Sequence, residues 1–114
     1  DYLRHNLRDR GREVFLVVVL NGRNQVLDIV ELFEGTLTTS AVYPREVIKL
    51  ILEKDAAAVI FVHNHPSGNP NPSKDGQNLT QILKAACSTI DVQLHDHLII
   101  AGNDYTSMAD KGMV

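Results

Sequence analysis

Residues 56–68 read AAAVIFVHNHPSG, an apolar run that ends in two histidines and then enters a polar loop. A continuous apolar run of this kind is typical of a strand that is buried on both faces. Residues 67–72 cannot continue a strand or a helix, because proline and glycine break both. The sequence therefore predicts a buried strand with His63 at its end, followed by an irregular loop.

A second apolar run lies upstream and predicts another central strand. Residues 14–20 read VFLVVVL, and the dipeptide Asn21-Gly22 that follows favours a turn. Residues 26–33 resume a strand pattern, which indicates an antiparallel hairpin with a residue or two of bulge around Arg23-Asn24. Gly35 is expected to end the second strand.

Apolar residues at helical spacing predict the elements between and after these strands. Pro44 suits a first helical turn, and apolar residues then recur on one face, so we expect a helix over 44–54. Ser73 suits an N-cap and predicts a helix that runs to about Ser88. Three weaker patterns complete the chain: a surface helix over 1–10, a strand over 92–100 interrupted at His95-Asp96-His97, and a last short strand over 105–108.

The order strand, strand, helix, strand, helix, strand predicts an α/β fold, in which a mixed β-sheet flanked by helices forms a sandwich without internal repeats. At 114 residues the chain can form one core but not two, so we expect a single domain over 1–114. Because it begins with Asp1 rather than Met, we expect it to be the C-terminal part of a longer protein.

Composition and charge narrow the functional classes. The formal net charge of -3 gives no overall attraction to a polyanion, so direct nucleic-acid binding is not supported. No apolar run approaches the roughly 20 residues that a membrane helix needs. A lone Cys87 excludes an intrachain disulfide and a CxxC zinc knuckle, which favours a reducing cytoplasm.

His63 and His65 lie two residues apart on an extended segment, so both imidazoles point to the same side. A catalytic zinc uses such a pair together with a carboxylate and leaves a position for water. The alternative is two loop histidines that hydrogen-bond to nearby backbone, which is the commoner fate of an isolated HxH pattern. The buried strand before the pair, and the rigid loop and polar helix start after it, favour the metal site.

Two other metal-enzyme patterns fit poorly. The letters HNH at 63–65 match a nuclease label, but in those enzymes the three residues are dispersed through a ββα-metal motif. A zinc deaminase needs HxE or CxE followed by PCxxC, which a chain with one cysteine cannot supply.

The stretch from His63 to Ser73, HNHPSGNPNPS, resembles the JAMM (MPN-type) metalloprotease motif in the form seen in the RadC family. Further RadC landmarks in family order extend the resemblance over essentially the whole chain: Gly35-Thr36-Leu37, Tyr43-Pro44-Arg45-Glu46-Val47, the Ala-rich run before His63, Asp96-His97-Leu98-Ile99-Ile100 and Tyr105-Thr106-Ser107. The resemblance implies a JAMM/MPN fold, which is a cytidine-deaminase-like sandwich, and zinc-dependent hydrolysis of a peptide or isopeptide-type substrate. The family's historical label is DNA repair.

The resemblance also implies roles for individual residues. Glu13, directly before the first central strand, matches the family's general acid/base, whereas a solvated charge is the commoner fate of a glutamate there. Ser73 matches the serine that supports the oxyanion, and an N-cap role explains the same residue. His63 and His65 match the histidine ligands of one Zn²⁺ per chain.

The carboxylate ligand departs from the family pattern, which places an aspartate three residues after that serine. Gly76 occupies this position, and Asp75 stands one residue early, a rotation of about 100° on a helix. Three cases follow: Asp75 substitutes as ligand, a two-histidine site binds zinc weakly, or the site is degenerate and the domain is a protein-interaction module without catalysis. The first is favoured, so the predicted metal ligands are His63, His65 and Asp75.

A second histidine pair lies in His95-Asp96-His97. If these residues alternate along a strand, His95 and His97 face one side and Asp96 faces the other. This pattern allows a second metal site, but a structural landmark is favoured, with Asp96 or His97 hydrogen-bonded near the edge of the sheet. The substrate and the oligomeric state stay open.

Overall fold

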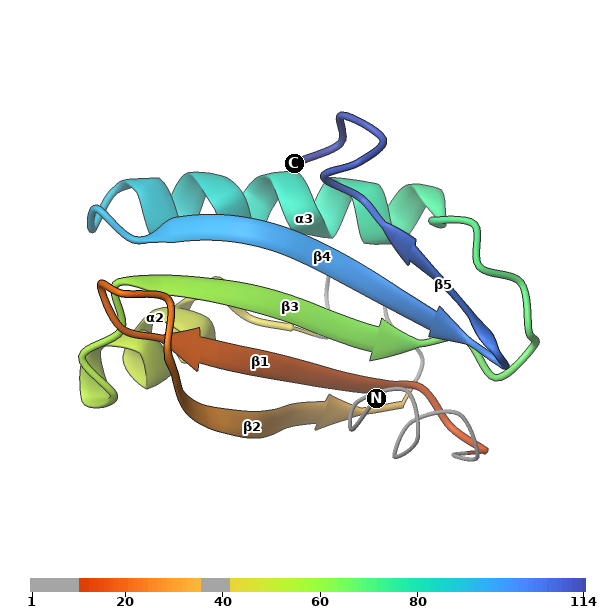
Figure 1. The fold of residues 1–114 in the computed structure, drawn as a ribbon, viewed down its shortest axis with the longest axis horizontal. Helices are drawn as coiled ribbons and strands as arrows, with labels where there is room; N and C mark the ends of the chain where they lie inside the picture. The colour runs from red at the N-terminus through yellow and green to blue at the C-terminus, as the bar shows by residue number, and fades with distance from the viewer. Residues whose placement is uncertain (1–10, 36–41) are drawn as a thin grey trace.

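The computed structural model describes residues 11–35 and 42–114 (Figure 1). The helix predicted over 1–10 lies outside these residues. The described elements follow in the order β1 (Val14–Leu20), β2 (Val26–Glu34), α2 (Pro44–Glu53), β3 (Ala58–Asn64), α3 (Lys74–Ser88), β4 (Gln93–Ala101) and β5 (Asp104–Ser107). The predicted α/β fold, a mixed sheet with helices packed on it, is confirmed.

The five strands form one sheet in the order β2-β1-β3-β4-β5 (Figure 1). β3 and β4 are parallel, and the other neighbouring pairs are antiparallel. In the β1–β3 pair Phe15 lies opposite His63, so the start of β1 lies beside the end of β3. This antiparallel register places Glu13 next to the histidine loop, although the two are about fifty residues apart in the sequence.

The predicted hairpin joins β1 to β2. Asn21 starts its loop, where its backbone N–H donates to Gln25 O at 3.0 Å, and Asn24 takes the left-handed conformation with φ 59°. Asparagine is among the few residues that tolerate this conformation. The turn dipeptide therefore located the hairpin correctly.

Both described helices cover the same face of the sheet (Figure 1). This face forms a core that joins Phe15 and Phe61 of the sheet to Ile51 of α2 and to Leu79 and Leu83 of α3. Alternate residues of β1 point to the opposite face, where they form a second buried cluster with other apolar strand residues. Neither described helix has the length and apolarity that crossing a membrane requires.

The interruption predicted at His95-Asp96-His97 is wrong, because β4 runs unbroken through these residues. A bulge lies there instead: Val59 pairs with Leu94 and Ile60 pairs with Asp96, so His95 is an extra residue without a partner in the register. A bulge of one residue reverses the alternation of side chains along a strand. Leu94 accordingly packs on the helix-covered core, whereas Leu98 and Ile100 join the opposite cluster.

Candidate metal and catalytic site

The end of β3 presents two imidazoles to each other. His63 is buried and His65 is half-buried, and their Nε2 atoms lie 2.9 Å apart. The i, i+2 spacing thus brings the two side chains together as the strand geometry predicts. Two ring nitrogens at this distance form the centre of the candidate site.

The loop after His65 fixes the orientation of its ring. His65 Nδ1 lies 2.8 Å from the backbone carbonyl oxygen of Asn69. Because a carbonyl oxygen only accepts, Nδ1 carries the hydrogen, and the Nε2 of the neutral ring is left with a lone pair. Gly68, whose φ of 83° suits glycine, lets the loop turn back so that its N–H donates to His65 O.

A chain of buried polar groups leads inward from His63. His63 Nδ1 lies 2.7 Å from His97 Nε2, and His97 Nδ1 lies 2.6 Å from Thr80 Oγ1. Thr80 Oγ1 in turn donates to Gly76 O at 2.7 Å. The three side chains come from β3, β4 and α3 and are at most 1% exposed, so water does not compete for these contacts.

Burial also controls the charge of these histidines. It lowers the pKa of His63 well below the ordinary value, with the neighbouring His97 and His65 acting in the same direction. Burial lowers the pKa of His97 to about 4. Both imidazoles are therefore neutral near pH 7, which is the form in which a histidine nitrogen binds metal.

Asn64, between the two histidines, holds the backbone on both sides of Glu13. Its Nδ2 donates to Arg12 O at 3.0 Å, and its Oδ1 accepts from Val14 N–H at 2.6 Å. The side-chain amide thereby extends the β1–β3 ladder beyond the last backbone pair. The predicted acid/base residue is fixed next to the histidine loop by this contact.

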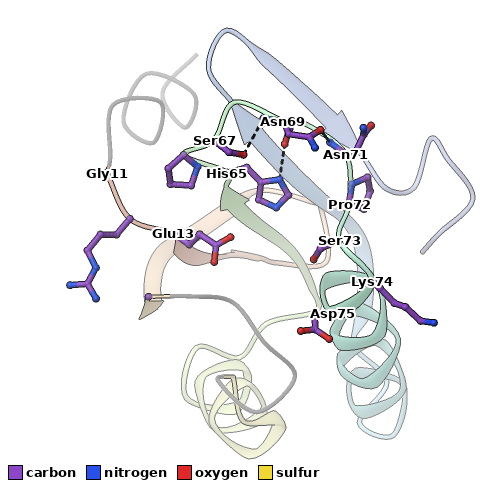
Figure 2. A pocket seen from close by; sticks show the side chains of 13 residues that line it. Gly11, Glu13, His65, Ser67, Asn69, Asn71, Pro72, Ser73, Lys74 and Asp75 are labelled. Atoms are coloured by element: carbon purple, nitrogen blue, oxygen red, sulfur yellow. Dashed lines mark hydrogen bonds between the residues drawn. The ribbon is translucent and has the colours of Figure 1, made fainter.

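A pocket of about 940 Å³ opens over these residues. Figure 2 shows Glu13, His65, Ser73 and Asp75 pointing into the same space from the residue before β1, the loop and the start of α3. Four of the five residues predicted from the sequence therefore line one pocket. The fifth, His63, is reached through its contact with His65.

Ser73 and Gly76 shape the first turn of α3. Ser73 is the N-cap, and its Oγ accepts from Gly76 N–H at 3.0 Å, which confirms the predicted cap. A Cβ built on Gly76 would lie 3.1 Å from Ser73 Oγ, so a side chain there requires a small shift of the hydroxyl.

The third predicted ligand stands apart from the histidines. Asp75 is exposed in the first turn of α3. Among residues 11–35 and 42–114, no three His, Cys, Asp or Glu side chains gather closely enough to hold a metal ion. Ligation by Asp75 accordingly stays a prediction that depends on movement of its carboxylate toward His65.

Sequence reasoning missed two members of the site, Thr80 and Asn64. Thr80 repeats the helical spacing four residues after Gly76, but only the fold brings it to His97. In the HxH pattern Asn64 is only the residue between the two histidines. Both act through contacts with residues distant in the sequence, and a local sequence pattern cannot predict such contacts.

The other polar residues of β4 have structural partners. Asp96 accepts from the backbone N–H groups of His97 and Ala109 and, at 2.5 Å, from Ser107 Oγ. His95 Nε2 lies 2.8 Å from Asn24 Oδ1. His95 and His97 thus contact different parts of the molecule. Asp96 lies on β4, next to the edge strand β5, so its bonds fit the predicted landmark role near the edge of the sheet.

Comparison with known proteins places the whole chain in one family. A profile described as a RadC-like JAB domain matches residues 1–113. A UPF0758 protein of Shewanella baltica strain OS185 is 49% identical over 114 residues, and UPF0758 proteins of Shewanella woodyi and Shewanella amazonensis are 48% identical over the same length. Each alignment covers 100% of this chain and 51% of the relative, so the chain spans about half the length of these proteins. The chain belongs to the family of RadC-like JAB domains.

Proposed function

We propose that this domain is a zinc-dependent hydrolase of peptide or isopeptide bonds, in which His63 and His65 hold the metal. The observation that supports this best is the 2.9 Å separation between Nε2 of His65, which lines the pocket, and Nε2 of the buried His63 behind it. Zinc takes imidazole nitrogens at about 2.0–2.1 Å, so two nitrogens at that separation can share one ion. The neutral state of the buried His63 also suits this role.

The remaining chemistry is assigned to groups that line the same pocket. Bound zinc supplies a Lewis acid that lowers the pKa of water toward about 7. Glu13 takes a proton from the attacking water and returns it to the leaving amine. Ser73 Oγ accepts from Gly76 N–H, which leaves its own hydrogen to donate to the carbonyl oxygen of the substrate. Asp75, which lines the pocket, completes the ligands by movement of its exposed carboxylate toward His65.

A second candidate function is an MPN-like protein-interaction module without metal or catalysis. Gly76 favours it, because the position at which the family pattern has its aspartate ligand offers no side chain. A cytoplasmic location fits either function, since the thiol of Cys87 is free and buried. The activity and partners of the longer protein belong to the same proposal.

Metal content tests the proposal directly. Protein purified without chelators is expected to carry one zinc per chain, measured by elemental analysis and by competition with a chromophoric chelator. His63→Ala should lose the metal. His95→Ala is the matched control, because His95 contacts Asn24 away from the pocket, and it should keep the metal. A parent protein with almost no zinc that also fails to take it up would refute the hydrolase.

Gly76→Asp separates the two candidate functions. If it creates zinc binding that the parent lacks, the natural site is degenerate and the interaction module is favoured. If affinity is unchanged, Asp75 or a water molecule already completes the site. In the second case Glu13→Gln should abolish cleavage of fluorogenic peptides while zinc content stays constant.

A further inference from the structure

The hydrogen bonds that link His63, His97, Thr80 and Gly76 O determine which nitrogen of each histidine carries the hydrogen. The assignment starts from the backbone carbonyl of Gly76. Gly76 O only accepts, so the single hydroxyl hydrogen of Thr80 is directed to it over 2.7 Å. Met108 Sδ lies 3.8 Å from the same hydroxyl and, as a weak and more distant acceptor, does not compete. Thr80 Oγ1 is therefore left to accept a hydrogen from its other neighbour.

That neighbour is His97, whose Nδ1 lies 2.6 Å from Thr80 Oγ1. Nδ1 must carry a hydrogen, so Nε2 of the neutral ring has a lone pair. His63 Nδ1 lies 2.7 Å from this lone pair and must donate to it. The hydrogen of His63 thus resides on Nδ1, and its Nε2 faces His65 with a lone pair.

His65, on the pocket side of the site, is held in the same tautomer by a separate contact. Asn69 O requires a hydrogen on His65 Nδ1, which leaves a lone pair on His65 Nε2. Two lone pairs then face each other over 2.9 Å, an arrangement that repels unless a cation lies between them. The two backbone carbonyls, one in the loop and one in α3, together prepare both nitrogens for a positive ion.

We propose that Thr80 and His97 are positioning residues that hold His63 in the tautomer able to bind metal. The inference rests on the proposed metal site. It concerns the series of hydrogen bonds from Gly76 O through Thr80 and His97 to His63, which we call the relay and which joins α3 to β4 and β3. The bulge at His95 is part of it, because it turns His97 toward Phe61 and the helix-covered face. Burial at both Thr80 and His97 keeps water from substituting for a missing partner.

Thr80→Val tests the relay, because valine keeps the shape of threonine and removes the hydroxyl. His97 Nδ1–H would then lack an acceptor, and a buried unsatisfied donor costs roughly 1–3 kcal/mol. Moving the hydrogen of His97 to Nε2 avoids this cost and makes His63 an acceptor at Nδ1. The hydrogen of His63 then moves to Nε2, where it blocks the metal-binding lone pair.

Long-range ¹H–¹⁵N correlation spectra of histidine-labelled, metal-free protein read these tautomers directly. The parent should show the hydrogen on Nδ1 of His63, His65 and His97. Thr80→Val should move it to Nε2 of His63 and His97 and weaken zinc binding about 10- to 100-fold. Thr80→Ser, which restores the hydroxyl, should return both properties to the parent values.

Thr89→Val is the matched control. Thr89 also donates its hydroxyl to a backbone carbonyl, that of Ala86, at the exposed end of α3. It should leave the tautomers and the zinc affinity unchanged. A parent with the hydrogen on Nε2 of His63 overturns the relay even if the Thr80 variants fold poorly, as does a folded Thr80→Val with parental tautomers. A parent that binds no zinc refutes the proposed function, while the spectra still decide the relay.

Discussion

Asn64 takes the place of a backbone peptide where the β1–β3 ladder ends. Its side-chain amide offers one donor and one acceptor, as a peptide group does, and uses them on Arg12 O and Val14 N–H. The residue between those two atoms is Glu13. A side chain at the end of β3 therefore fixes the backbone of the proposed acid/base residue.

Asn64→Ala should destabilise the domain by about 1–3 kcal/mol, because it leaves the buried Val14 N–H without its acceptor and removes the donor to the part-buried Arg12 O. Urea unfolding measures the loss, and hydrogen exchange of the Val14 amide should become much faster. Asn69→Ala is the control, since Asn69 accepts from Asn71 N–H at the exposed surface and should cost well under half as much. Parental exchange at Val14 in the Asn64 variant would contradict the anchoring role.

The candidate site was predictable to the extent that it depends on neighbours in the sequence. The spacing of His63 and His65 on an extended segment was enough to place their imidazoles together. The link from His63 to His97 spans 34 residues and that from Thr80 to His97 spans 17, so both depend on the tertiary fold. Gly76 shows the converse, because the family pattern has an aspartate at a position where this chain has glycine.

At the scale of the elements, the strand and helix bounds follow the sequence closely. Continuous apolar runs marked β1 and β3, and the 3.6-residue spacing marked α2 and α3. The exception is β4, where the polar run His95-Asp96-His97 predicts a break that the structure does not have. A bulge and a break look alike in a hydropathy pattern, because both disturb the alternation, and only the register distinguishes them.

The helix-covered core depends on one face of α3, which neighbouring positions can test. Leu83 is fully buried, whereas Ile82 beside it is 45% exposed. Leu83→Ala should cost about 2–5 kcal/mol of unfolding free energy, and Ile82→Ala about 1 kcal/mol or less. Urea titrations of both variants provide the comparison. Equal losses would show that α3 is not packed by the face described.

For the whole molecule, neutral buried histidines make stability depend on pH. His97 has an ordinary pKa of 6.5 when unfolded and about 4 in the fold, and burial lowers the pKa of His63 in the same direction. Between these values the unfolded chain binds more protons than the folded one. The contribution of these neutral histidines to the unfolding free energy is therefore fully present above pH 6.5 and is lost as the pH falls toward 4.

In metal-free protein, the unfolding free energy should fall by roughly 3 kcal/mol from His97 alone between pH 7.5 and 4. Chemical denaturation at several pH values in the presence of a chelator measures this slope. His97→Phe should flatten it, since the rings of Phe15 and Phe61 around this position can accept another aromatic side chain. An equally steep slope in that variant would assign the acid sensitivity to other groups.

The extra residue in β4 bears on how the domain tolerates changes in length. The bulge at His95 reverses which residues of β4 face the helices. Before His95 the even-numbered residues face them, and after His95 the odd-numbered residues do. A substitution at residue 95 alters one side chain that contacts Asn24. Deletion of the same residue would exchange the two faces in one half of the strand, so that the side chain of His97 would point away from Thr80. The presence of residue 95 therefore matters more to the site than its identity.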